Sequence, residues 1–173
     1  MLEALVTYFY CMDLMDITGW FTLLSMAFVV LWRAYAFRRW FRVGMFGTLA
    51  MWLAVTLWIT VLHRTPGIVY PLEWIPFHSL RALFATGQRE ILRTNFMNTA
   101  LFYPAGLLAA ALLPKRWRYW LTLLIAIFAV FSFGIEYAQY HWVLGRPEMD
   151  DVVFNTLGAA LGGAMFCFWD KVI

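Results

Sequence analysis

The sequence predicts an all-α membrane protein, a bundle of about five transmembrane helices, on two observations. Of its 173 residues, 64% are apolar and 13% are charged, whereas soluble domains are roughly 45–50% apolar and about 25% charged. The charged residues also leave five uncharged stretches, each near the ~20 residues that cross a bilayer. These are residues 17–32, 43–62, 94–114, 119–135 and 152–169. Helices are expected because period-two alternation is absent and lipid cannot pair the backbone of open strands.

The five stretches differ in how readily each can span a bilayer. The second and third are long enough as they stand, and the fourth and fifth are long enough if a polar end residue enters the interface. The first is the shortest, and residues 34–37 extend it if Arg33 reaches towards water. No internal repeat or low-complexity tract divides the chain, so we predict one domain over residues 1–173.

An interfacial amphipathic helix is expected in the loop at 63–95, between the second and third stretches. Apolar residues recur there at roughly helical spacing, and polar residues occupy the other faces. The apolar positions are Leu80, Leu83, Phe84 and Ile91, and the polar ones are Arg81, Gln88, Arg89 and Arg93. Such a helix lies along the membrane surface. Residues 1–16 are a second candidate for a surface element.

Two short basic loops orient the bundle. One holds Arg33, Arg38, Arg39 and Arg42, and the other holds Lys115, Arg116 and Arg118. Basic short loops stay in the cytoplasm, so we expect the N-terminus outside and the C-terminus inside. Cys11 and Cys167 then lie at opposite faces, too far apart for a disulfide. The basic residues form no continuous stripe, which argues against nucleic acid as a partner.

Polar residues gather at the outer ends of three predicted helices. An ionisable group inside a membrane helix is costly, so by default it indicates a functional site. The predicted cluster comprises Asn95, Asn98, Glu136, Gln139, Arg146, Asp150, Asp151 and Asn155. In the third and fifth helices, Pro104, Gly106, Gly158 and Gly162 are expected to shape helix packing, since small residues four apart allow close approach.

Each polar residue also has a purely structural interpretation. Amides can bond neighbouring helices, at about 0.6 kcal/mol each. Asp150 and Asp151 can cap the last helix, where a carboxylate is favoured, and Arg146 can pair with Glu136 or with an Asp. A stabilising network, however, does not need three carboxylates, an Arg and four amides, so the whole cluster favours function. No metal-ligand spacing is present and no cofactor is expected.

Three segments resemble the VanZ-like family. They are WIPFHSL at 74–80, NFMNTALFYPAGLL at 95–108 and IEYAQYHWVLGRPEMDDVVFNTLGAALGG at 135–163. The resemblance covers about 73–163, and its last segment places Glu136, Gln139, Arg146, Asp150, Asp151, Asn155 and Gly158 on one ordered pattern. It implies a protein of the bacterial cytoplasmic (inner) membrane. The family's namesake is associated with low-level resistance to teicoplanin, a lipoglycopeptide that acts on cell-wall precursors outside the membrane.

Three functions remain open from the residues. The leading one is a non-enzymatic protein that binds a lipid-linked or lipidated envelope molecule, such as a lipoglycopeptide or cell-wall precursor, among membrane lipids. In it, Arg81, Arg89, Arg93 and Arg146 would contact phosphate or carboxylate. The second is an intramembrane enzyme acting on a lipid phosphate or ester, with Glu136 or Asp151 as general base and Arg146 stabilising an anionic transition state. The third is a small transporter or flippase.

Overall fold

The computed structural model of the chain describes residues 14–35, 39–71, 73–113 and 117–172. Every regular element in these ranges is a helix, and the only strand-like pairing there is a single parallel bridge between Glu73 and Glu148. The all-α prediction is therefore confirmed. Cys11 lies outside the described residues, so the predicted absence of a disulfide to Cys167 stays a prediction. Most of the surface element predicted at 1–16 also lies outside them.

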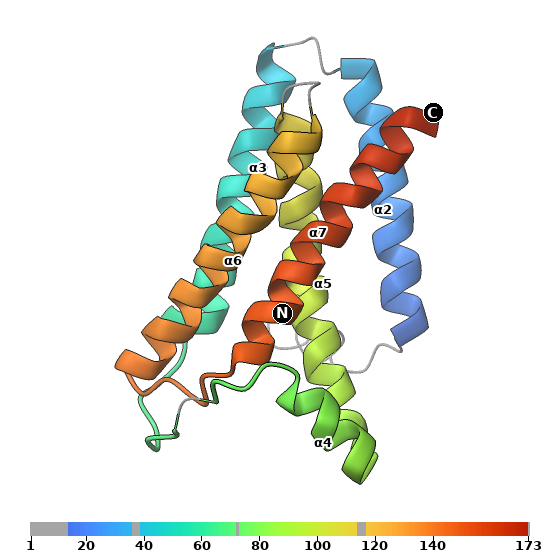
Figure 1. Cartoon of the computed structure of the whole chain (residues 1–173). Helices are drawn as coiled ribbons and strands as arrows, with labels where there is room; N and C mark the ends of the chain where they lie inside the picture. Colours follow the sequence, from blue (N-terminus) through green and yellow to red (C-terminus); the bar gives the residue numbers. More distant parts are fainter. Residues whose placement is uncertain (1–13, 36–38, 72, 114–116, 173) are drawn as a thin grey trace.

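The long helices follow the uncharged stretches of the sequence (Figure 1). They are α2 (Leu14–Tyr35), α3 (Arg39–Leu57) with its π-helical continuation η1 (Trp58–Leu62), α5 (Arg89–Leu112), α6 (Trp117–His141) and α7 (Met149–Val172). Within the described chain, three segments are long and apolar enough to cross a membrane: Arg39–Leu62, Trp120–His141 and Met149–Val172. The third predicted stretch, in α5, has the length but includes two Asn and a Pro, which lower its hydropathy. The first, in α2, gives a shorter apolar segment at Leu23–Tyr35.

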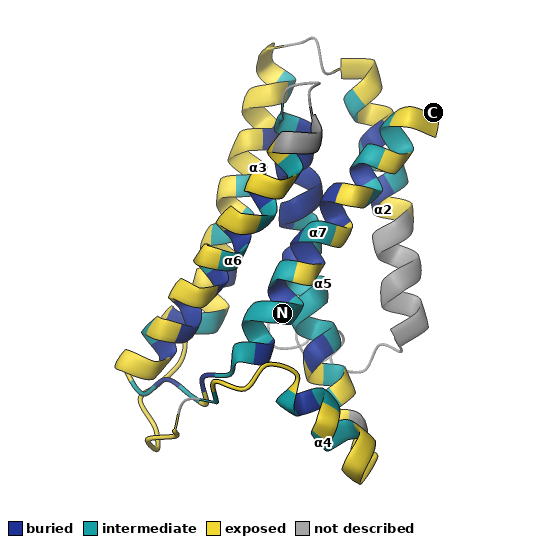
Figure 2. Cartoon of the chain, viewed as in Figure 1, coloured by how far each residue is buried: buried dark blue, intermediate teal, exposed yellow. Residues whose placement is uncertain are grey.

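Helices α5 and α7 form the most extensive contact of the bundle, with α6 packed on α7 and α3 on α5. Buried residues follow these shared faces, while the outer faces of α3 and α6 are exposed (Figure 2). The exposed outer residues are large and apolar, as Phe46, Trp58 and Val130 illustrate. An apolar exterior around an apolar core is what lipid, rather than water, would cover.

Glycines set the distance between α5 and α7. A Cβ atom at Gly158 would lie 2.1 Å from the Thr99 carbonyl oxygen, and one at Gly162 would lie 2.0 Å from that of Tyr103. Gly106 on α5 meets α7 in the same way, 2.0 Å from the Ala159 carbonyl oxygen. The two backbones thus touch without side chains between them. Pro104 lies inside α5 and does not end the helix.

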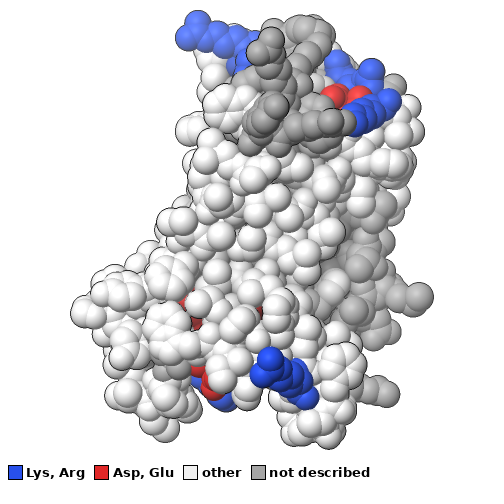
Figure 3. Space-filling model, viewed as in Figure 1, with Lys and Arg blue, Asp and Glu red and all other residues white. Residues whose placement is uncertain are grey.

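The charged residues lie at the two ends of the bundle. On the face drawn in Figure 3, Lys, Arg, Asp and Glu gather at both ends, with an uncharged band between them. One end carries the end of α2, the start of α3, the end of α5, the start of α6 and the end of α7 (Figure 1). The other carries α4 (His78–Thr86) and the α6–α7 turn, so the polar ends of three helices meet there.

The amphipathic helix of the 63–95 loop is shorter than its sequence pattern suggests. α4 ends at Thr86, and Gly87 follows in a left-handed conformation with φ 65°. This glycine turn redirects the chain, so Arg89, Ile91 and Arg93 belong to α5 rather than to a continued surface helix. Phe84 on α4 is 86% exposed, and Leu83 is half-buried.

Candidate functional site

A short backbone pairing joins the segment before α4 to the turn between α6 and α7. The Glu73 amide donates to the Pro147 carbonyl (3.2 Å), and the Met149 amide donates to the Glu73 carbonyl (3.0 Å). The turn itself is sharp, since Val143 has φ 55° and Gly145 has φ 151°. The pairing holds the start of α4 beside the start of α7, although the two are far apart in the sequence.

Asp150 caps α4 from the first turn of α7. Asp150 is only 2% exposed. Its carboxylate accepts hydrogen bonds from the Phe77 amide and from the Ser79 amide, the second at 2.6 Å. These N–H groups open α4 and have no partner within the helix. The Ser79 hydroxyl in turn accepts from Asn95 Nδ2 on α5 (2.9 Å). The interpretation that Asp150 caps its own helix is therefore wrong: its carboxylate serves a different helix.

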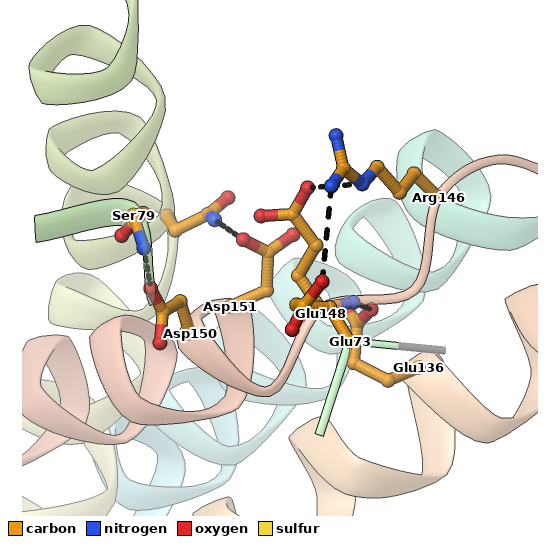
Figure 4. Close-up of polar contacts among 8 residues, drawn as sticks. Glu73, Ser79, Glu136, Arg146, Glu148, Asp150 and Asp151 are labelled. Carbon is orange, nitrogen blue, oxygen red and sulfur yellow. Dashed lines mark hydrogen bonds and ion pairs between the residues drawn. The ribbon is translucent and has the colours of Figure 1, made fainter. Parts of the chain in front are cut away.

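Two further carboxylates lie on the facing ends of α6 and α7 (Figure 4). Glu136, 4% exposed, accepts at Oε2 from the Glu148 amide (3.1 Å). Asp151 accepts at Oδ1 from Asn98 Nδ2 (2.6 Å), which links α7 to α5. The two carboxylates lie close enough to act electrostatically on each other. Neither pairs with an Arg within hydrogen-bond or ion-pair distance in the described part of the chain.

One turn deeper, α6 and α7 are joined by amides. Asn155 Nδ2 donates to the Ser132 hydroxyl (2.9 Å), and Asn155 Oδ1 is buried without a hydrogen-bond partner in the described structure. Gln139 Nε2 donates to the Thr60 carbonyl in η1 (3.1 Å). The first contact joins α6 to α7 beneath the carboxylates, and the second joins α6 to η1 nearer the end of the bundle.

Arg146 does not pair with Glu136 or with either Asp, contrary to the sequence interpretation. Its guanidinium lies 3.2 Å from Glu148 and 3.9 Å from Glu73, and the side chain is 52% exposed. The sharp turn directs Arg146 outwards over the backbone pairing, away from the helix ends (Figure 4). Burial raises the pKa of Glu148 above its usual value, and the neighbouring Arg146 opposes that rise.

The remaining predicted arginines are dispersed. Arg81 is exposed on α4 and makes no ion pair with a described residue, and Arg93 is half-buried on α5. The side chain of Arg89 lies outside the described residues. Arg64, which sequence reasoning missed, acts electrostatically on both Glu136 and Asp151 and donates to the Leu144 carbonyl (3.4 Å).

Several other participants were absent from the predicted cluster. They are Thr60, Glu73, Ser79, Ser132 and Glu148. Glu148 could have been found from its place two residues after Arg146, and Ser132 from its helical spacing to Glu136. Nothing local distinguishes Glu73, because its role depends on a long-range backbone pairing. Within the described chain, no group of three His, Cys, Asp or Glu side chains could hold a metal ion.

The apolar helices and their buried polar cluster define a helical membrane protein. The family model of VanZ/LLP1 matches residues 45–170, which include the whole cluster. The chain belongs to this family, and the resemblance seen in its motifs is confirmed. No curated protein and no solved structure matches the chain.

Proposed function

We propose that this protein is a non-enzymatic, membrane-embedded binding protein for the polar headgroup of a lipid-linked or lipidated envelope molecule. The observation that carries the proposal is the pair of carboxylates at Glu136 and Asp151. They lie at the ends of adjacent helices, each with one oxygen hydrogen-bonded and no Arg bound to it in the described structure. A shielded carboxyl oxygen without a hydrogen-bond partner costs free energy, so we propose that a ligand donor supplies what the protein does not.

The proposed orientation places this cluster outside. In it, all five long helices cross the membrane, and the end bearing Arg39, Arg42 and Lys171 faces the cytoplasm. α4 then lies in the outer interface, where the exposed side chains of Phe84 and Trp74 would contact lipid. A headgroup attached to a lipid tail could reach the cluster sideways from that leaflet.

A lipidated ligand agrees with the family relationship. The resemblance to the VanZ-like family implies a link to teicoplanin, whose acyl chain places it at the outer membrane surface. We propose that the ligand is such a lipoglycopeptide or a cell-wall precursor, and that the protein contributes to glycopeptide resistance by holding it.

Native mass spectrometry of the detergent-purified full chain tests the proposal. We expect the wild type to retain a lipid-linked or lipidated molecule, and Glu136→Gln to lose most of it because the substitution removes a charged acceptor. Glu90→Gln is the matched control, since Glu90 is exposed in the first turn of α5. Equal retention by wild type and Glu136→Gln, or no retained ligand in the wild type, would contradict the proposal.

A further inference from the structure

Two basic groups near the cluster, Arg146 and Arg64, have partners within the protein. Arg146 pairs with Glu73 and Glu148 at the surface. Arg64 is exposed and donates to a backbone carbonyl, that of Leu144. Arg81 is exposed and makes no ion pair with any residue that the structure describes. None of these three arginines hydrogen-bonds or ion-pairs with Glu136 or Asp151 in the described structure.

The amide side chains of the cluster each donate one hydrogen bond within the protein. Asn95 Nδ2 binds Ser79, Asn98 Nδ2 binds Asp151, and Gln139 Nε2 binds the Thr60 carbonyl. Each of these bonds stays within the protein. Both oxygens of Asp150 are also used, by the amides that open α4. Unused acceptor atoms remain on three other side chains.

Those three acceptors belong to successive turns of the facing helices α6 and α7. Glu136 Oε1 and Asp151 Oδ2 accept no hydrogen bond from the residues described, and Asn155 Oδ1 is buried without a partner. The Asn155–Ser132 bond joins the two antiparallel helices one turn below. Glu136 follows Ser132 by four residues on α6, and Asp151 precedes Asn155 by four residues on α7. Residues four apart share a helix face, so Glu136, Asp151 and Asn155 lie on the faces that α6 and α7 turn towards each other.

Unfilled acceptors on two carboxyl groups and one amide favour a cation that carries hydrogen-bond donors. A primary ammonium has three N–H donors and one positive charge, which match three acceptors and relieve the repulsion between two carboxylates. We propose that Glu136, Asp151 and Asn155 form a binding site for a primary ammonium group on the headgroup. This inference rests on the proposed function and specifies the chemical class of its ligand.

Binding of short-chain lipids with identical acyl chains tests the ammonium site. Titration calorimetry of the detergent-purified full chain would compare dihexanoyl phosphatidylethanolamine, phosphatidylcholine and phosphatidylglycerol. Only the first has a primary ammonium, while the second has a cation without N–H donors. We expect the wild type to bind phosphatidylethanolamine at least about tenfold more tightly than the others, since hydrogen bonds to charged groups contribute that much. Glu136→Gln and Asp151→Asn should lose this preference, and Glu90→Gln should keep it.

The comparison of the three lipids is made on the wild type, so its outcome does not depend on whether a variant folds. Equal binding of the three lipids, or tighter binding of phosphatidylglycerol, would overturn the ammonium site and leave a headgroup-binding function standing. Absence of binding by all three, together with a bare native mass spectrum, would overturn both proposals. Competition by free ethanolamine would show that the amine suffices, whereas competition only by the short-chain lipid would show that the lipid portion is needed as well.

Discussion

At the scale of single residues, Asp150 and Asp151 are adjacent in the chain and have different tasks. Asp150 turns towards α4 and has both oxygens occupied by backbone amides. Asp151 turns towards α5 and α6, where one oxygen binds Asn98 and the carboxylate faces Glu136. Neighbouring positions on a helix point about 100° apart, so one carboxylate caps α4 and the other reaches the interface with α5 and α6.

Replacing Asp150 by Asn should release α4 from the bundle. The neutral amide keeps the shape but loses the charge that the two helix-opening N–H groups favour, at a cost of about 1–3 kcal/mol. Hydrogen exchange followed by mass spectrometry should show faster exchange of the α4 amides, with α5 and α7 unchanged. Asp170→Asn, at the other end of α7, serves as control. Unchanged protection of α4 in Asp150→Asn would refute the capping role.

At the scale of helices, the α5–α7 pair positions the cluster. Gly106, Gly158 and Gly162 let the two backbones meet directly, and the polar ends of both helices lie just beyond this contact. Separating the helices at the glycines would therefore also separate Asn98 from Asp151, whose bond is 2.6 Å long.

Gly158→Ala should destabilise the bundle. The added methyl group would lie 2.1 Å from the Thr99 carbonyl oxygen, which belongs to the backbone and cannot turn aside. Overpacking of this kind costs about 1–3 kcal/mol, measurable as a lower thermal midpoint in detergent. Gly134→Ala on α6 is the comparison, because nothing lies within 4 Å of its Cβ position. Alanine is the better helix former, so this variant should match or slightly exceed the wild type. Equal stability of the two variants would argue against backbone contact.

At the scale of the whole molecule, the bundle separates a basic end from an acid-rich end. The basic end carries Arg33, Arg39, Arg42 and Lys171, whereas the cluster end carries Glu73, Glu136, Glu148, Asp150 and Asp151 together with Arg64, Arg81 and Arg146. An apolar band lies between them on the face shown (Figure 3). This distribution is what a protein with one cytoplasmic and one outer face would have.

Labelling of single cysteines in intact cells should reveal that orientation. In a background with Cys11→Ser and Cys167→Ser, we expect Trp142→Cys at the α6–α7 turn to react with a membrane-impermeant maleimide. Arg39→Cys should react only after the cells are opened, because basic loops stay in the cytoplasm. Trp142 is 56% exposed, so access should not limit its reaction. The reverse pattern would place the cluster inside and remove the proposed access from the outer leaflet.

Much of the fold and part of the site could be predicted from local sequence. Long uncharged stretches became long helices, and helical spacing correctly grouped Asn95, Asn98, Glu136, Asp151 and Asn155 at one end. The end of α4 at Gly87 was missed, because apolar spacing continues through Ile91 while the backbone turns. A left-handed glycine interrupts a helix without interrupting its hydrophobic pattern.

The sequence by itself determined the helical class, the membrane character of the helices and the family. These depend on composition, on helix-length apolar runs and on motif order, which are local properties of the chain. Only the tertiary structure decided which polar groups meet. Asp150 binds the Phe77 amide 73 positions away, and Arg146 pairs with Glu73 instead of Glu136. Such pairings depend on turn geometry and on backbone contact between helices, which no local pattern specifies.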